Sequence, residues 1–404
     1  MTPHLPPGEP TAGAPQLGAL SGIRVADFSR VLAGPYATMM LADFGADVIK
    51  IEHPAGDDTR TWRPPVDANG MATYFSSVNR GKRSIVCDLS TPEGLATATR
   101  LALSADIVIE NFRPGTMERF GLGYAELSAQ RPALVYCSIT GFGAEAGAAL
   151  PGYDLLVQAV GGLMSITGTE PDKPAKVGVA LVDVLTGLNA LVGIQAALRV
   201  RDSTGLGQRV EVNLLQSLLA GLVNQAASTL TTGVSPARLG NAHPSIAPYE
   251  TLNAADRVIA IAVGNDRQFR NLTEVLELTD LADDPRFATN PQRVAHRDML
   301  HDLLEARLIE RPAATWLPLL AAAGVPAGPV NTVAEALELA DELGLAGTAT
   351  IAGAPHVVNP IRLSATPPTY RAGPPRLGEH EGAEWLLDSI PLTVAPAASV
   401  LTKE

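Results

Sequence analysis

IRVADFSRVLAGPYATMMLADFGADVIKI, residues 23–51, decides the fold of this chain. It contains a short apolar run typical of a buried strand (Ile23 to Phe28), a stretch with helical periodicity (Ala33 to Phe44) and a second apolar run (Ala46 to Ile51). The alternation continues with a helix at Glu93 to Ser104, a strand at Asp106 to Glu110, a helix at Tyr124 to Gln130 and a strand at Ala133 to Ile139. Repeated units of this kind predict an α/β fold, with a Rossmann-like large domain around a parallel sheet.

The pattern changes in the second half of the chain. Gln216 to Leu230 has helical periodicity, and Ser235 to Leu252 is a loop rich in turn formers before a new strand, Val258 to Val263. Further helices are expected at Asn265 to Leu276, His296 to Ile309, Ala313 to Ala323 and Thr332 to Gly344. Helices that follow an isolated strand indicate a smaller α+β domain, and the Pro-rich segment after it, His356 to Gly378, has few periodic signals.

The composition limits the classes of function. Of the 404 residues, 46% are hydrophobic and 18% charged, which is typical of a globular protein and excludes a disordered chain. A net charge of −12 repels nucleic acid and anionic membranes, and an aromatic share of 4% argues against a platform for single strands. We therefore predict no nucleic-acid or membrane partner, and any anionic ligand must meet a local cluster of Arg and Lys.

The cysteines and the first residues point to a reduced compartment. Cys87 and Cys137 lie in apolar contexts without metal-type spacing, so we expect buried free thiols and a cytoplasmic protein. No cluster of His, Asp or Glu has metal spacing, and no metal is expected. Residues 1–18 lack the basic and apolar segments of a secretory signal, and their Pro and Gly content predicts a disordered tail.

Asp183 is the only charged residue in the apolar run Val177 to Leu198. The run is long enough to span a bilayer, but polar residues and glycines interrupt it, so we interpret it as a strand, Val177 to Val182, followed by a helix, Leu185 to Val200. Asp183 then lies at a helix N-terminus, where a carboxylate is favoured. An ionised group in apolar surroundings is costly, so this residue has either a capping or a chemical role.

Two basic clusters stand out in the acidic chain. ENFRPGTMERFG, residues 110–121, places Asn111, Arg113 and Arg119 just past a strand end, where open α/β sheets bind ligands and where phosphates find Arg side chains and N–H groups. NRGKRS, residues 79–84, adds Arg80 and Lys82. GFGAEAG, residues 141–147, lacks the glycine spacing and the following helix of a dinucleotide fingerprint.

Several motifs together resemble the class III CoA-transferase family, which also contains formyl-CoA transferase and α-methylacyl-CoA racemase. They are, in chain order, DFSRVLAGPYATMMLADFGADVIKIE (27–52), NRGKRS (79–84), ENFRPGTMERFG (110–121), GYDLLVQAVGGLMSITG (152–168), VALVDVLTG (179–187), TGLGQRVEV (204–212) and GVPAGPVNTV (324–333). The resemblance extends from about Leu20 to Leu387.

The resemblance implies an interlocked homodimer, in which two chains thread through each other's openings. Residues 19–215 would form the first part of a Rossmann-like CoA-binding domain. A linker helix and loop would occupy residues 216–240, and a small α+β domain residues 241–333. Residues 334–404 would return to complete the large domain.

The resemblance also implies a mechanism. Asp183 matches the family's nucleophile, which attacks an acyl-CoA thioester, forms a mixed anhydride and then an aspartyl-CoA thioester, and passes CoA to an acceptor acid. Oxyanions would meet backbone N–H groups near glycines such as Gly141 and Gly187. The residues expected along CoA are Arg30, Asn111, Phe112, Arg113 and Arg119, with the basic cluster of Arg80 and Lys82 nearby. The chain lacks the glycine run that gates the formate and oxalate enzyme, so that gating is not expected.

Two alternative functions remain open. The racemase branch uses a His where this chain has Tyr153, a poor partner for proton transfer near neutral pH. An acyl-CoA-binding protein without activity is the other alternative. GNAHPSIAPYETL, residues 240–252, is similar to succinate-hydroxymethylglutarate CoA-transferase, and its His243, Ser245 and Tyr249 could bind a distal carboxylate. We therefore expect CoA transfer from succinyl-CoA or another dicarboxylyl-CoA to a small carboxylic acid.

Overall fold

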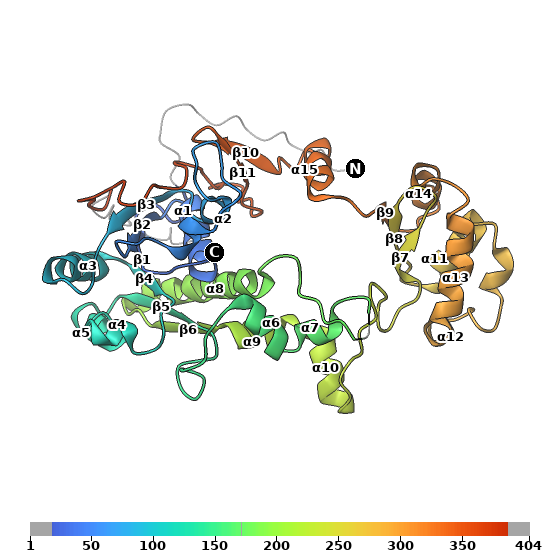
Figure 1. Cartoon of the computed structure of the whole chain (residues 1–404), viewed down its shortest axis with the longest axis horizontal. Helices are drawn as coiled ribbons and strands as arrows, with labels where there is room; N and C mark the ends of the chain where they lie inside the picture. Colours follow the sequence, from blue (N-terminus) through green and yellow to red (C-terminus); the bar gives the residue numbers. More distant parts are fainter. Residues whose placement is uncertain (1–17, 171, 387–404) are drawn as a thin grey trace, which may run out of the picture. The chain divides into compact units, whose positions relative to one another are not determined.

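The computed structural model describes residues 18–170 and 172–386, which form two compact units (Figure 1). The first unit combines the chain up to Asp154, Leu181–Ser217 and the chain from Thr348 onward, and the second combines Leu155–Ala180 and Leu218–Gly347. The expected domain limits place residues 155–180 and 334–347 in the large domain, whereas this division groups them with the second unit. The expected tail, apart from Gly18, lies outside the described residues.

The first unit is the larger α/β unit. Its elements are, in chain order, β1 (Arg24–Asp27), α1 (Ala33–Asp43), β2 (Asp47–Glu52), η1 (Asp58–Thr61), α2 (Thr73–Ser77), β3 (Lys82–Val86), α3 (Pro92–Ser104), β4 (Ile107–Glu110), α4 (Thr116–Arg119), α5 (Tyr124–Gln130), β5 (Val135–Thr140), α8 (Leu181–Thr204), β6 (Arg209–Asn213), β10 (Thr348–Ile351) and β11 (Ala354–Val357). Two helices, α6 (Asp154–Val160) and α9 (Leu214–Gly221), begin in this unit and end in the second.

The large sheet has the strand order β3-β2-β1-β4-β5-β6, and every neighbouring pair is parallel. This is the doubly wound order expected of a Rossmann-like unit. The order reverses between β1 and β4, so the loops that follow these two strands, at residues 28–32 and 111–115, leave the same edge and diverge. A crevice outside the carboxyl ends of the strands forms at such a switch point and is the usual ligand site of the fold.

Alternate residues of the strands face two helical layers. Ala26, Ile49 and Val108 contribute to the core that includes residues of α3 and α5. On the other face α1 packs against α8 and β2, and α8 packs against β5 and β6. The approach of α1 to α8 depends on Gly187, because a Cβ there would lie 2.6 Å from the Ala33 carbonyl oxygen.

The helix α8 begins earlier than expected. The chain before it, from 174 to 180, is irregular and not a strand, and the helix already includes Asp183 in its first turn. By length and hydropathy α8 could cross a membrane, but half of its most apolar window is buried inside the structure, as in the core helix of a globular unit.

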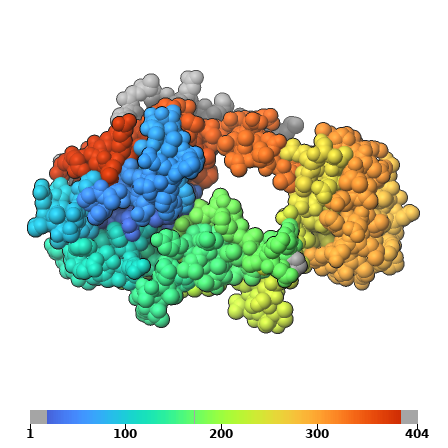
Figure 2. Space-filling view, viewed as in Figure 1, coloured from blue at the N-terminus to red at the C-terminus, as the bar shows by residue number. Residues whose placement is uncertain are grey.

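Residues 372–380 lie against β3 and the loops near it, and in Figure 2 the red residues adjoin the blue ones. The His380 backbone N–H donates to the Ser84 carbonyl at 2.9 Å, and the Gly81 N–H donates to Ala372 at 2.9 Å. Arg60 Nη1 donates to the Pro375 carbonyl at 3.1 Å. These bonds explain why a segment with few periodic signals is nevertheless fixed: it is held by the large unit and not by its own secondary structure.

The second unit has a three-stranded antiparallel sheet in the order β7-β8-β9. Its elements are α7 (Leu163–Ile166), α10 (Val223–Thr232), β7 (Tyr249–Asn253), β8 (Val258–Ala262), α11 (Asp266–Val275), η2 (Thr279–Ala282), α12 (Asn290–Ala295), α13 (Arg297–Leu308), α14 (Ala313–Ala322), β9 (Ala327–Pro329) and α15 (Val333–Glu342). A core around Trp316, Phe269 and Ile261 closes the unit, and the Trp316 indole donates to the Leu308 carbonyl at 2.8 Å.

Candidate active site

A pocket opens at the switch point of the large sheet, entirely within the first unit. Its walls come from the loops after β1, β4 and β5 and from the first turn of α8. The residues that line it include Arg30, Val31, Leu32, Ala33, Asp58, Asn111, Phe112, Arg113, Thr140, Gly141, Gly152, Tyr153, Asp154 and Asp183. The pocket thus brings together most of the residues expected along CoA and the expected nucleophile.

Asp183 is the third residue of α8 and is only 9% exposed. Burial, and next the neighbouring carboxylate of Asp154, raises the pKa of Asp183 from 3.8 to about 7. Among the described residues the Asp183 carboxylate has no hydrogen-bond or ion-pair partner. An unpartnered carboxylate that lines a pocket is poised for chemistry more than for structure.

The cap of α8 is Asp154. Its Oδ1 accepts the backbone N–H of Val182 at 2.8 Å and that of Asp183 at 3.3 Å. The orphan N–H groups of a helix start need such a partner, and here a residue from the start of α6 provides it. The two roles left open for Asp183 are thereby separated, because a second carboxylate does the capping.

One wall of the pocket is cationic and aromatic. The Arg30 guanidinium lies 5.2 Å from the centroid of the Phe112 ring. The Asn111 side chain fixes the Arg30 backbone from both sides, since Oδ1 accepts the Arg30 N–H at 2.8 Å and Nδ2 donates to the Arg30 carbonyl at 2.7 Å. Arg113 is exposed on the same loop. Such a wall suits a phosphorylated ligand with an aromatic base.

Beneath Phe112, Glu110 is buried at the end of β4. Burial raises the pKa of Glu110 to about 7, although the Ser138 hydroxyl and the Phe112 N–H both donate to its carboxylate. The Phe112 N–H bond, at 2.8 Å, ties the aromatic wall to the strand. A carboxylate in this position therefore supports the loop that carries Asn111, Phe112 and Arg113.

The comparisons with known proteins agree with this geometry. Residues 20–381 match CoA-transferase family III. The chain belongs to this family. It is 45% identical over 395 residues to the succinate–glutarate CoA-transferase of Agrobacterium fabrum, which covers 93% of this chain and 98% of that relative. It is 40% identical over 380 residues to the succinyl-CoA:glutarate CoA-transferase of Mus musculus, with 92% and 87% covered.

A solved structure shows the same fold. The CAIB/BAIF family protein from Brucella suis is 46% identical, has a TM-score of 0.83 and covers 90% of this chain and 98% of its own. The chain is therefore a CoA-transferase that acts on acyl-CoA and carboxylic acids, and the prediction of an α/β enzyme of this family is confirmed.

Four of the residues expected at the site of this CoA-transferase lie elsewhere. Arg80 is 3% exposed and pairs with Asp43 at 2.6 Å, and Lys82 is 1% exposed and pairs with Asp27 at 3.1 Å, so both cations balance buried carboxylates. Arg119 is exposed outside the pocket lining, with its guanidinium 5.2 Å from the Phe120 ring centroid.

Gly187 is the fourth. It lies inside α8, where the helix uses its backbone, and its missing side chain serves the contact with α1. Gly141, in contrast, lines the pocket. A Cβ on Gly141 would lie 2.5 Å from the Cα of Gly152, so two loops meet there without side chains. Next to this contact the Tyr153 side chain is 63% exposed in the pocket wall.

Two parts of the pocket were missed in the sequence. Asp154 follows Tyr153 in the GYD motif, but nothing in the sequence relates it to a helix that begins 27 residues later. Leu32 and Ala33 at the start of α1 also line the pocket, and this helix has no side-chain cap. An uncapped helix start offers N–H groups and the positive end of the helix dipole to an anion.

The residues expected to bind the acceptor acid lie in the second unit. His243 Nδ1 accepts the Ser245 N–H at 3.1 Å, and its ring lies 5.3 Å from that of Tyr249. Because Nδ1 is an acceptor, a neutral His243 carries its proton on Nε2 and can donate from there. Among the described residues no group of His, Cys, Asp and Glu could hold a metal ion.

Proposed function

We propose that this enzyme transfers CoA from succinyl-CoA to a dicarboxylic acid such as glutarate, with Asp183 as the covalent nucleophile. The observation that carries the proposal is the buried carboxylate of Asp183, which lines the pocket without a partner while Asp154 caps its helix. The choice of acids is supported by the relatives named for succinate and glutarate.

Each chemical step is an acyl transfer. The Asp183 carboxylate attacks the thioester carbonyl of succinyl-CoA, and the C–S bond breaks, which leaves a succinyl-aspartyl anhydride and CoA thiolate. The thiolate attacks the aspartyl carbonyl, releases succinate and leaves an aspartyl-CoA thioester. The acceptor carboxylate then attacks this thioester and expels CoA thiolate, which attacks the acceptor's carbonyl and frees Asp183. No proton is transferred, and atoms and charges balance at every step.

The raised pKa of Asp183 fits this role. With a pKa of about 7 the carboxyl group is ionised in a large fraction near neutral pH, and its poor solvation makes the ionised form more reactive than an exposed carboxylate. The oxyanions of the tetrahedral intermediates need preorganised donors. The N–H groups at the uncapped start of α1, beside Ala33, are better candidates than Gly187, whose N–H lies within a helix.

The CoA moiety is expected on the cationic and aromatic wall. Arg30 and Arg113 would meet phosphates, and Phe112 offers a ring to the adenine. Arg80, Lys82 and Arg119 have no part in this proposal, because the first two balance buried carboxylates and the third does not line the pocket.

The second unit would select the acceptor acid. Nε2–H of His243 and the hydroxyl of Tyr249, which is 43% exposed, are donors suited to a distal carboxylate. The loop that carries them is firmly held, since the buried guanidinium of Arg293 donates to the Ala247 carbonyl at 2.7 Å and Asn290 Nδ2 donates to the Ser245 carbonyl at 2.9 Å.

A homodimer in the cytoplasm belongs to the same proposal. Large apolar side chains are exposed on helices of both units, which is the surface that a partner chain would cover. Examples are Val192 at 66%, Val223 at 70%, Leu230 at 87% and Val333 at 81%. The cysteines Cys87 and Cys137 are both free and buried, as in a reducing compartment.

The test is a search for the covalent intermediate. Wild-type enzyme is incubated with succinyl-CoA, digested, and the peptide that contains Asp183 is examined by mass spectrometry for a CoA adduct that hydroxylamine removes. Asp154→Ala is the matched control, because it alters the neighbouring carboxylate and keeps the nucleophile. An Asp183→Ala variant that still exchanges CoA at the wild-type rate, without any adduct, would refute the role of Asp183.

A further inference from the structure

The loop between β1 and α1 contains a strained residue in the wall of the active site. Val31 has a φ of 67°, in the left-handed region that a β-branched side chain rarely adopts. A residue of this kind persists only where the surrounding structure holds it. Arg30, Val31 and Leu32 all line the pocket, so whatever holds Val31 also shapes the site.

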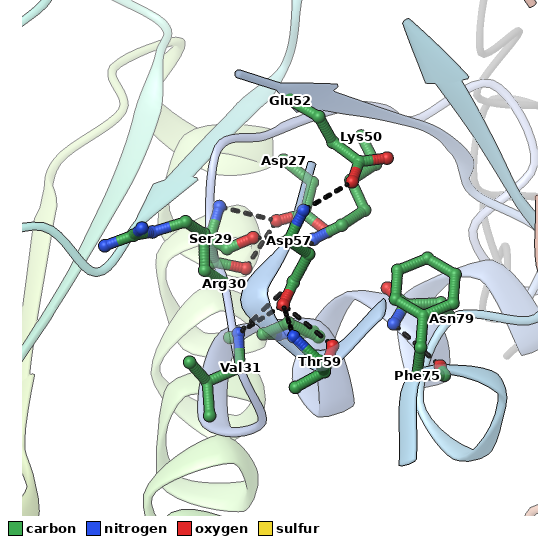
Figure 3. A network of polar contacts seen from close by, with 12 residues as sticks. Asp27, Ser29, Arg30, Val31, Lys50, Glu52, Asp57, Thr59, Phe75 and Asn79 are labelled. Atoms are coloured by element: carbon green, nitrogen blue, oxygen red, sulfur yellow. Dashed lines mark hydrogen bonds and ion pairs between the residues drawn. The ribbon is translucent and has the colours of Figure 1, made fainter. Parts of the chain in front are cut away.

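Buried side chains hold this loop in place, and Figure 3 shows Asp57 between Lys50 and Val31. The Asp57 carboxylate accepts the Val31 backbone N–H at 3.3 Å from Oδ1 and 3.2 Å from Oδ2. Lys50 Nζ donates to the Ser29 carbonyl at 2.7 Å and pairs with Asp57 Oδ2 at 2.9 Å. Asp27 accepts both the N–H and the hydroxyl of Ser29. The loop is thus fixed at two residues, Ser29 and Val31.

Asp57 is itself fixed in place. Its backbone N–H donates to Glu52 Oε2 at 3.0 Å, and Oδ1 accepts the N–H and the hydroxyl of Thr59 at 3.0 and 2.7 Å. It is 1% exposed. Burial by itself would raise the pKa of Asp57, but Lys50 and the bonds from Thr59 hold it below its ordinary value, so the carboxylate stays ionised.

We propose that Asp57 is a positioning residue for CoA transfer: its carboxylate holds Val31 in the left-handed conformation and thereby fixes the wall that carries Arg30 and Leu32. Asp57 lies outside the pocket lining, and it acts only through the loop. The inference rests on the proposed binding of acyl-CoA in this pocket.

A purely structural role is the competing explanation, because buried ion pairs in the same unit serve stability. Asp43 provides the matched comparison. It is 2% exposed, pairs with Arg80 at 2.6 Å and accepts a bond from Asn359 at 3.3 Å. Its side chain lies at the far end of α1 from the loop. Asp43→Ala therefore removes a buried carboxylate of the same kind without releasing Val31.

The experiment is a double-mutant cycle of Asp57→Ala and Val31→Gly, read by kcat/KM for succinyl-CoA with glutarate, by the Kd of CoA and by Tm. Alanine is used because asparagine would keep an oxygen that accepts the Val31 N–H. Glycine adopts positive φ without strain, so Val31→Gly makes the hold of Asp57 unnecessary. We expect Asp57→Ala to lower kcat/KM by roughly 10- to 100-fold and to weaken CoA binding. In the double variant both should return to within about threefold of Val31→Gly alone, while the loss in Tm remains.

Asp43→Ala should lower Tm and leave kcat/KM and the Kd of CoA within about threefold of wild type. If Asp57→Ala does not fold, Thr59→Ala serves instead, because it loosens Asp57 without removing its charge, and Val31→Gly should suppress its smaller loss. Losses that multiply in the double variant, or an Asp57→Ala protein with wild-type kcat/KM, overturn the inference. If the wild-type enzyme transfers CoA to no acid, the proposed function is wrong. The effect of each variant on the Kd of CoA would then still test the role of Asp57.

Discussion

Replacing Asp154 by Asn separates the two effects that this residue has on Asp183. Asparagine keeps an oxygen that can accept the Val182 and Asp183 N–H groups, so α8 stays capped. It removes the negative charge beside the nucleophile. We therefore expect the pKa of Asp183 to fall, and the acidic limb of kcat/KM against pH to move to lower pH, since only the ionised carboxylate attacks.

The size of the change follows from the pKa. The difference between 3.8 and about 7 corresponds to about 4 kcal/mol in favour of the protonated form. Burial is the larger cause and Asp154 the smaller, so the share of Asp154 is below half, about 2 kcal/mol at most. The limb should then move from near pH 7 toward about pH 6, with an upper bound of roughly 1.5 pH units. At high pH, where Asp183 is ionised in both proteins, the rate of Asp154→Asn should be below that of wild type, because a less basic carboxylate is a weaker nucleophile.

The assay is the initial rate of CoA exchange between succinyl-CoA and glutarate, measured from about pH 5 to about pH 9 for wild type, Asp154→Asn and Asp154→Ala. Asp154→Ala shares the loss of charge but also loses the cap, which costs about 1 kcal/mol of stability. Both variants should shift the limb alike, and only the alanine should lower Tm markedly. An acidic limb that stays in place, or that moves to higher pH, in Asp154→Asn would show that Asp154 does not set the reactivity of Asp183.

Three further outcomes are expected. Because the pKa of Asp183 is raised in the folded protein, its contribution to stability is full below about pH 3.8 and is lost as pH rises through about 7. In urea unfolding at pH 8, Asp183→Asn should therefore have a free energy of unfolding up to roughly 4 kcal/mol above that of wild type, and the difference should be smaller at pH 5. Gly187→Ala should destabilise the enzyme by about 1–3 kcal/mol despite the better helix propensity of alanine, because its Cβ would lie 2.6 Å from the Ala33 oxygen; a rise in Tm would contradict this packing. His243→Ala should raise the KM of glutarate roughly tenfold and leave the Kd of free CoA, which has no distal carboxylate, unchanged; an equal effect on both would remove His243 from acceptor selection.

The regular elements of the large unit were predictable because local pattern and tertiary role agree. The helix expected at Tyr124 to Gln130 has those limits in the structure, and α1 ends within one residue of its expected end. The strand β3 was missed for a physical reason. Its buried residues Lys82 and Ser84 are polar, and they donate hydrogen bonds to Asp27 of β1 and to Glu52 of β2. A strand whose inner face is charged has no apolar alternation to detect.

The opposite error occurred before α8. Residues 177–182 have the β-branched character of a strand, yet Val179 is 60% exposed and the helix has already begun at Leu181. A short apolar run does not reveal whether a neighbouring strand is available to pair with it. Sheet pairing is a property of the whole fold, so such a run is ambiguous in the sequence.

The same distinction applies to the site. Arg30, Asn111 and Phe112 follow strands that flank the switch point, and strand order alone places them together. Whether Arg80 and Lys82 bind a ligand depended on carboxylates 37 and 55 residues away, which no local pattern connects to them. Charge in a sequence indicates binding only when the fold supplies no partner for it.

Asp183 is the reverse case, and it explains how one helix start can serve stability and chemistry together. A lone carboxylate in the first turn of α8 would satisfy the helix and be stabilised by it, which would lower its pKa and its reactivity. The fold brings a second carboxylate from Asp154, 29 residues away, to the same N–H groups, so the stabilising role is taken and Asp183 keeps a costly, unpartnered charge. The strain at Val31 has the same logic, since buried ions hold a conformation that the loop would not keep alone. In both places stability supplied by neighbours preserves a reactive or strained group at the pocket, and loss of the neighbour should therefore change activity before it unfolds the protein.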